Sequence, residues 1–210
     1  MQAPQREVLV IGIGNVLWAD EGFGVRCVEA LNAAYAFPDG VVLMDGGTLG
    51  LALYDEVAQA KRVIVLDAVD YQLSPGSLKL LRDAEVPAWA RSKLSPHQVG
   101  FNDVLALAAL QGRGPARITV IGVQPEVLDD FGGSLRPCVR ARVDEVVELA
   151  AAELTAWGFP GRRRLAGEAY EPLNDRSLAI GDYESGRPSE DEACRVGDER
   201  VLVASRRKES

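Results

Sequence analysis

The chain has 210 residues, a formal net charge of −8 and 47% hydrophobic residues. This size and composition are typical of one globular domain with a substantial core. No basic patch stands out, which argues against a nucleic-acid partner. The first residues carry no apolar signal core, and no stretch comes near the roughly 18 apolar residues of a membrane span. We therefore expect a cytoplasmic protein without membrane insertion, and a monomer.

The first predicted elements are a strand and a helix joined by a glycine-rich loop. Residues 7–11 form an apolar, β-branched run that is typical of a buried strand. Residues 12–24 carry four glycines and the acid pair Asp20 and Glu21. Apolar residues then recur at helical spacing over residues 25–35. A strand that leads through such a loop into a helix usually binds a ligand at the carboxyl end of a parallel sheet.

Two classes of ligand are compatible with this loop. Dinucleotide-binding loops carry a third glycine, and the pyrophosphate rests on the following helix N-terminus. Gly12 and Gly14 match that pattern, but Leu17 stands at the third glycine position. Asp20 and Glu21 would repel phosphate. The loop therefore favours a cation or acid–base chemistry, and a nucleotide-binding Rossmann-like module remains the alternative.

The rest of the chain up to residue 160 alternates strands and helices. The further predicted strands are residues 41–44, 63–66, 77–81 and 118–123. The further predicted helices are residues 48–58, 95–112 and 137–157, the last of which ends at Gly158. This alternation indicates an α/β domain of three layers around a parallel sheet.

The regular pattern ends near residue 160. Residues 161–210 are rich in Gly, Pro, Glu and Arg, a composition that disfavours a packed core. We therefore divide the chain into an α/β domain of residues 1–160 and a C-terminal extension of residues 161–210, which we expect to be flexible. Two short apolar clusters in the extension, residues 178–180 and 201–203, either pair as strands or stay solvated.

Three acids occupy equivalent places after three consecutive predicted strands. Glu21 lies in the loop after the first strand, Asp45 closes the second strand, and Asp67 closes the third. Each acid alone could cap a helix, but the carboxyl ends of parallel strands face the same crevice. His97 is the single histidine and begins a helical pattern. Two carboxylates and one imidazole suit a divalent metal and leave positions open for water or another ligand.

Four motifs stand in matching order along residues 7–157. They are Gly12-x-Gly-Asn-x-Leu-x-x-Asp-Glu-Gly-x-Gly24, Asp45-Gly-Gly-Thr48, Asp67-Ala68 and Ser95-Pro-His-Gln98. In these motifs the chain resembles the endopeptidases that mature the large subunit of [NiFe] hydrogenases. The tail beyond about residue 160 departs from the shorter family members, and with it the chain looks more like the proteases that serve membrane-bound uptake hydrogenases. The resemblance implies a five-stranded twisted sheet flanked by helices on both faces.

The resemblance also implies a reaction and a site. The reaction is a single cut that removes a C-terminal extension from the hydrogenase large-subunit precursor after nickel insertion. In the family, the positions matching Glu21, Asp67 and His97 contact the metal, and the position matching Asp45 is an active-site carboxylate. Nickel comes with the precursor, whose cysteine thiolates complete the metal site, so the metal acts as a recognition signal. No organic cofactor is implied.

The catalytic group stays open at this point. The sequence contains no Gly-x-Ser-x-Gly elbow and no His-Glu-x-x-His motif, which leaves water activated by a carboxylate or by the metal. We assign Glu21 and Asp67 to the metal and Asp45 to the role of general base, so that all three are candidate catalytic carboxylates. A non-proteolytic nickel carrier is a further alternative.

Overall fold

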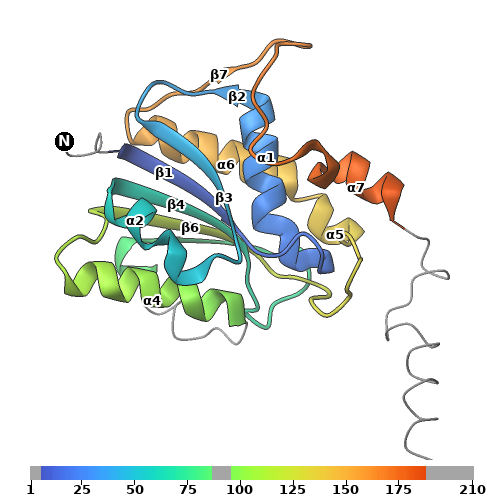
Figure 1. The fold of residues 1–210 in the computed structure, drawn as a ribbon, viewed down its shortest axis with the longest axis horizontal. Coiled ribbons are helices and arrows are strands. Elements are labelled where there is room, and N and C mark those ends of the chain that lie inside the picture. The colour runs from blue at the N-terminus through green and yellow to red at the C-terminus, as the bar shows by residue number, and fades with distance from the viewer. Residues whose placement is uncertain (1–5, 87–95, 188–210) are drawn as a thin grey trace, which may run out of the picture.

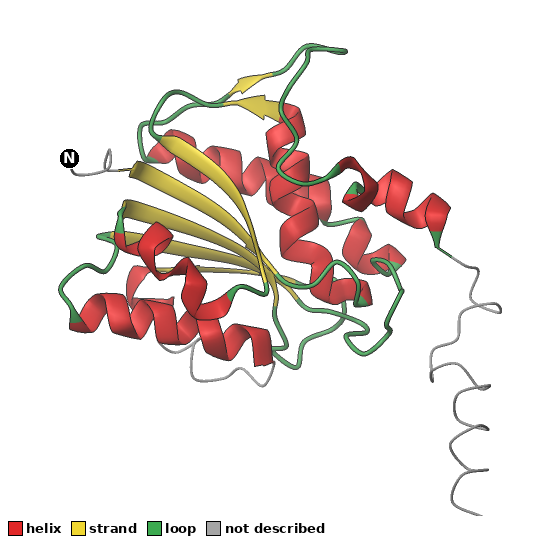
Figure 2. Cartoon of the chain, in the orientation of Figure 1, coloured by secondary structure: helices red, strands yellow, loops and turns green. Residues whose placement is uncertain are grey.

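A five-stranded sheet forms the middle layer of the molecule, with the strand order β3-β1-β4-β6-β5 (Figure 1). The computed structural model describes residues 6–86 and 96–187, and only the backbone of residues 96–99. The strands of the sheet are β1 (Arg6–Ile13), β3 (Val41–Gly47), β4 (Ala60–Ala68), β5 (Leu78–Arg82) and β6 (Arg117–Val123). Helices cover both faces (Figure 2), so the predicted three-layer α/β architecture with five strands is confirmed.

Each face of the sheet is covered by a pair of helices. The first pair is α1 (Phe23–Ala34) and α6 (Val143–Ala156), and the second pair is α2 (Tyr54–Ala58) and α4 (Pro96–Leu110). Alternate residues of each strand point toward opposite faces. In β4, Ile64 packs toward α1 and α6, whereas Val63 packs toward α2 and α4. Within the described ranges, no helix combines the length and the apolar character that crossing a membrane requires.

The strand order reverses beside β1. Helix α1 leads from β1 to β3 on one side, and α2 leads from β3 to β4 on the other side of β1. The carboxyl ends of β1 and β4 therefore flank the point of reversal, which is the usual ligand position in an open α/β sheet. Strand β5 pairs antiparallel with β6, so the sheet is mixed, and the parallel arrangement expected from the alternation of strands and helices does not extend to this edge. The connection of residues 69–77 is too short for the helical crossover that a parallel strand requires.

The predicted helix of residues 137–157 is two helices in the structure. Helix α5 (Pro137–Arg140) ends in a tight turn, in which the Arg142 N–H bonds to the Val139 carbonyl, and α6 begins after it. At the far end, Gly158 has a φ of +90°, and the Phe159 N–H donates to the Leu154 carbonyl at 2.9 Å. This Schellman motif confirms the predicted helix end, because glycine adopts the left-handed conformation without strain.

Part of the C-terminal extension lies along helix α1 (Figure 1). Strand β7 (Arg162–Arg163) pairs antiparallel with β2 (Tyr35–Ala36), and η4 (Arg176–Leu178) and α7 (Ile180–Gly186) follow. Ile180 packs against the core beneath α1 and α6, so residues 178–180 form neither a strand nor a solvated cluster. Residues 201–203 lie outside the described ranges. The division at residue 160 and the flexibility of the whole extension stay predictions.

Candidate functional site

The glycines after β1 allow backbone segments to approach closely. A Cβ atom on Gly14, whose φ is +128°, would collide with the carbonyl oxygen of Glu21. A Cβ atom on Gly24 would collide with the carbonyl oxygen of Leu66 in β4. These glycines fold the loop back on itself and bring the start of α1 against the end of β4. Their evident role is backbone packing that carries Glu21 to the sheet edge, and not the phosphate contact of a dinucleotide loop.

Asp20 holds the loop in place from inside the protein. Its side chain is fully buried. The Oδ2 atom accepts the N–H groups of Glu126 at 2.8 Å and of Val127 at 3.0 Å, and Oδ1 accepts the N–H of Arg136 at 2.7 Å. Three backbone donors from the loop after β6 therefore converge on one carboxylate. Asp20 joins that loop to η1 (Ala19–Gly22), which is a structural role.

Glu21 and Asp67 lie at the point where the strand order reverses. Glu21 is half-buried on η1, and η1 packs against β4. Asp67 is the penultimate residue of β4 and is 3% exposed. The fold therefore carries these two carboxylates to one edge of the sheet, Glu21 on the 3-10 turn that follows β1 and Asp67 on β4, beside the expected ligand position.

The side chain of Asp67 faces the layer of α2 and α4. Tyr71 packs in that layer, where burial and the negative charge of Asp67 raise the pKa of the Tyr71 hydroxyl. Helix α4 precedes β6, which runs parallel to β4, so α4 begins at the carboxyl edge of the sheet (Figure 1). The backbone of His97 lies in the first turn of α4, in the same layer as Asp67.

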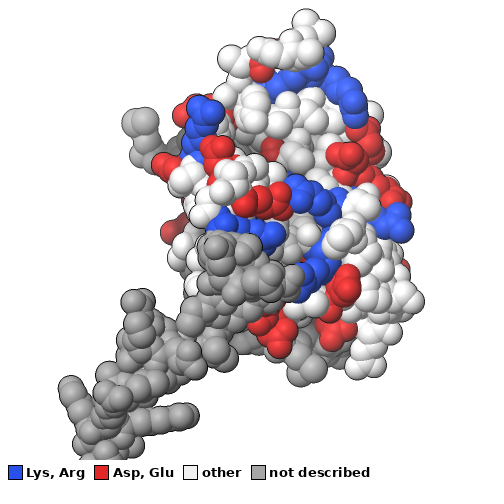
Figure 3. Space-filling model, turned by 90° about the vertical axis from the view of Figure 1, so that its right-hand side faces the viewer, with Lys and Arg blue, Asp and Glu red and all other residues white. Residues whose placement is uncertain are grey.

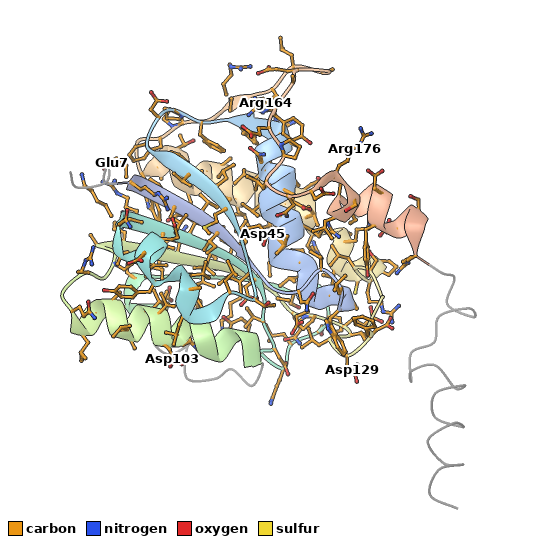
Figure 4. The ribbon with its side chains drawn as sticks, in the orientation of Figure 1. Glu7, Asp45, Asp103, Asp129, Arg164 and Arg176 are labelled. Carbon is orange, nitrogen blue, oxygen red and sulfur yellow. The ribbon has the colours of Figure 1, made fainter. Side chains whose placement is uncertain are left out.

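Asp45 lies at the same edge but on the other face. It pairs with Gly12 of β1, and Gly12 pairs with Leu66 of β4, so β1 separates Asp45 from Asp67. Two strand spacings amount to about 10 Å. The side chain of Asp45 points toward α1 (Figure 4), as does that of Leu43 two positions earlier. We expected the three carboxylates to face one crevice; the structure brings them to one edge and places Asp45 and Asp67 on opposite faces.

Two hydrogen bonds hold the Asp45 carboxylate. The N–H of Gly47 donates to Oδ1 at 2.7 Å, and Nδ2 of Asn174 donates to Oδ2 at 2.6 Å. Burial raises the pKa of Asp45 above its ordinary value. The two hydrogen bonds oppose that effect, the negative charge of Glu29 adds to it, and the positive charge of Arg26 opposes it. The result is a half-buried carboxylate whose pKa is raised toward neutrality.

Of the three predicted metal ligands, the structure describes the side chains of Glu21 and Asp67 but not that of His97. Among the side chains that the structure describes, no group of three or more His, Cys, Asp or Glu could hold a metal ion. The side chain of His97 lies outside that description. Glu21 and Asp67 supply oxygen ligands at one edge, which is chemistry suited to a divalent cation. The set of Glu21, Asp67 and His97 therefore stays a prediction.

Sequence reasoning missed two of these features. Asn174 is 129 positions from Asp45, in a region without a helical or strand-like pattern, and no sequence signal marks it. Asp20 was grouped with Glu21 as an available acid, because the backbone donors that surround it leave no mark in the sequence.

Comparison with known proteins points to one family. A family model described as hydrogenase maturation protease matches residues 25–153. The hydrogenase expression/formation protein HoxM of Azotobacter vinelandii is 55% identical over 203 residues, which is 96% of each chain. The hydrogenase 2 maturation protease of Escherichia coli is 43% identical over 152 residues, which covers 72% of this chain and 92% of that protein.

Solved structures agree with the sequence comparisons. The hydrogenase maturating endopeptidase HybD from E. coli superposes with a TM-score of 0.72 and 40% identity, covering 75% of this chain and 98% of its own. The [NiFe] hydrogenase maturation protease HybD from Thermococcus kodakarensis superposes with a TM-score of 0.59 and 28% identity, covering 70% and 98%. A substantial part of this chain therefore has no counterpart in either structure.

Proposed function

The chain belongs to the hydrogenase maturation protease family, and from that premise we propose that it removes the C-terminal extension of a [NiFe] hydrogenase large-subunit precursor after nickel insertion. Family membership makes it a protease of hydrogenase maturation. The observation that carries the finer proposal is the placement of Glu21, on η1 after β1, and of Asp67, near the end of β4, beside the reversal of strand order. This edge is where an open α/β sheet receives its ligand.

Nickel enters this proposal as part of the substrate. Two carboxylates from Glu21 and Asp67 and an imidazole from His97 would give an incomplete set of ligands. Nickel that is still held by thiolates of the precursor would complete the set. The metal would then tether the precursor and raise the effective concentration of the scissile bond at the site. A precursor without nickel would lack the tether and stay uncut.

Asp45 is the proposed general base. Its raised pKa favours this role, because a carboxylate whose pKa lies closer to neutrality is a stronger base. Its position across β1 from Asp67 separates the base from the metal ligands. The precursor chain would have to cross the end of β1 to reach from one to the other. Glu21 and Asp67 would then serve catalysis through the metal.

The test is processing of purified, nickel-loaded precursor, followed by gel mobility. We expect the wild-type protein to shift the precursor band. His97→Ala and Asp67→Asn should slow the shift by at least about 100-fold, since each removes a ligand. If both variants process the precursor at the wild-type rate, the proposed metal site is wrong, whereas the proteolytic activity itself stands.

The nickel requirement is tested with rigorously nickel-free precursor. We expect no band shift, and efficient cleavage would refute recognition through nickel. If folded wild-type protein leaves competent, nickel-loaded precursor uncut, the nickel-carrier and nucleotide-binding alternatives are favoured. A carrier would bind nickel tightly and in stoichiometric amount by itself, whereas a protease completed by its substrate would bind nickel only weakly.

A further inference from the structure

Asn174 contacts two carboxylates at once. Its Nδ2 lies 2.6 Å from Oδ2 of Asp45 and 3.0 Å from Oε1 of Glu29. A side-chain amide nitrogen has two hydrogens, so each acceptor receives one. The N–H of Gly47 holds the other oxygen of Asp45. One oxygen of Asp45 is therefore fixed by its own strand, and the other is fixed from the C-terminal extension.

The stretch that carries Asn174, residues 164–182, is anchored to α1 on both sides of it; we call this stretch the strap. Before Asn174, Nδ2 of Asn32 donates to the carbonyl of Glu171 at 2.8 Å. After Asn174, the guanidinium of Arg26 donates to the carbonyl of Leu178. Arg26 is 4% exposed and also donates to Glu29 at 2.9 Å. These anchors fix the backbone around Asn174 without using Asn174 itself.

The strap continues into contacts beyond α1. The hydroxyl of Tyr183 donates to the carbonyl of Gly133 at 3.1 Å, and Arg140 donates to Glu184 at 2.7 Å. Acidic and basic side chains are interspersed over the face of the molecule that Figure 3 shows. The strap and α7 are thus held by polar contacts with α1, with α5 and with the loop that Asp20 secures.

We propose that Asn174 is a positioning residue that orients the Asp45 carboxylate for the hydrolytic step, so that the strap forms part of the active site. This inference rests on the processing activity and on the role of Asp45 proposed above. A carboxylate held at both oxygens cannot rotate, and each oxygen keeps a further lone pair for a proton. Preorganisation of this kind places the base where it is needed before the substrate arrives.

The choice of an amide supports this role over a merely structural one. Arg or Lys at position 174 would pair with Asp45 more strongly and would lower its pKa, which weakens a base. The neutral amide fixes the carboxylate without adding positive charge. The charged groups that act on Asp45 from α1 are Glu29, which raises its pKa, and Arg26, which lowers it. Asn174 supports the ionised form against burial and against Glu29.

The experiment compares Asn174→Leu with Asn32→Leu in the full chain. Both substitutions replace an amide by an apolar side chain of similar size. Only the first removes the donor to Asp45, whereas the second releases one anchor of the strap. We expect Asn174→Leu to lower the processing rate at neutral pH about tenfold and to move the acid limb of the pH–rate profile upward by about one pH unit. Asn32→Leu should keep the position of the wild-type acid limb, because the Asn174 amide stays beside Asp45 and the Arg26 anchor to Leu178 remains.

A second variant and a second measurement keep the test decisive. Asn174→Asp is isosteric and places a like charge beside Asp45, so it should move the acid limb further upward. Titration of the Asp45 carboxyl by NMR should show the same order of midpoints without any substrate. An unchanged midpoint in Asn174→Leu, or equal loss of rate in both Leu variants with no shift in pH profile, would overturn the inference. If wild type cuts no precursor, the proposed function fails, and the titration still reports whether Asn174 controls Asp45.

Discussion

Asp20 and Asp45 are two aspartates at the same edge of the sheet with contrasting surroundings. Asp20 is fully buried, and three backbone N–H groups from the loop after β6 point at its two oxygens. Asp45 is half-buried and receives one backbone N–H and one side-chain amide. Asp20 is satisfied by backbone donors alone. Asp45 retains exposure and depends on a side chain for half of its contacts.

The surroundings of an aspartate decide whether it stabilises the fold or is available for catalysis. A buried carboxylate that accepts three N–H groups stabilises a loop, because removing it leaves those donors unsatisfied. A half-buried carboxylate with fewer donors has lone pairs left for a proton, and burial raises its pKa toward the range in which a general base works. We therefore expect substitutions at Asp20 to affect folding and substitutions at Asp45 to affect turnover.

The largest expected effect is that of Asp45→Asn on processing. We expect the rate to fall by about 1,000-fold, because the amide cannot accept the proton that a general base must take. The free energy of unfolding should stay within about 1 kcal/mol of wild type, since the replacement is isosteric and removes a half-buried charge. Single-turnover cleavage of nickel-loaded precursor and urea unfolding measure the two quantities. Turnover near the wild-type rate would remove Asp45 from the role of base.

Asp20→Asn should show the opposite pattern. Its amide nitrogen would meet a backbone N–H at one of the two oxygen positions, which leaves a buried donor facing a donor. We expect the free energy of unfolding to fall by about 3 kcal/mol. Urea unfolding checks this loss, and processing per folded molecule should stay close to wild type. If Asp20→Asn unfolds like wild type but stops cleavage, Asp20 belongs to the chemistry and the contrast with Asp45 is wrong.

Much of the fold could be predicted from the sequence, because it depends on local periodicity. The strands appear as apolar runs, and Gly158 marks a helix end that the structure reproduces. The antiparallel direction of β5 was missed, although the short connection of residues 69–77 leaves no room for a parallel crossover; its pairing with β6 is a non-local contact. The break between α5 and α6 was also missed, since apolar spacing continues through the turn.

The sequence predicted that the three acids lie at one edge of the sheet, but it did not predict which face of the sheet each side chain takes. Glu21 follows β1, Asp45 and Asp67 lie near the carboxyl ends of β3 and β4, and strand ends gather at one edge. Which face each side chain takes depends on register, and one position along a strand reverses it. Asn174 could not be predicted, because its position beside Asp45 results from the path of the strap over α1.

The smallest expected effect is that of substituting Glu153, a third carboxylate that can be compared with Asp20 and Asp45. This carboxylate is 7% exposed and accepts hydrogen bonds from Arg82 at 2.8 Å and from Thr119 at 3.0 Å. Burial alone would raise the pKa of Glu153, but the hydrogen bonds and the positive charge of Arg82 outweigh it and hold the pKa below its ordinary value of 4.5. Glu153 is thus satisfied, as Asp20 is, but by side chains.

The sign of the pH dependence follows from these pKa directions. A lowered folded-state pKa contributes stability that is present above pH 4.5 and is lost as the pH falls through the folded-state value. Glu153→Gln should therefore cost about 1 kcal/mol at neutral pH, a small loss because Arg82 is half-exposed and water screens the pair. Urea unfolding should show this difference shrink as the pH falls below 4.5 through the lowered folded-state pKa of Glu153. Asp45, whose folded-state pKa is raised, destabilises the fold as the pH rises through that value. With rising pH, Asp45→Asn should therefore become more stable relative to wild type, whereas Glu153→Gln should become less stable relative to wild type. Parallel trends in the two variants would contradict the contrast between a satisfied carboxylate and one that retains the capacity to take up a proton.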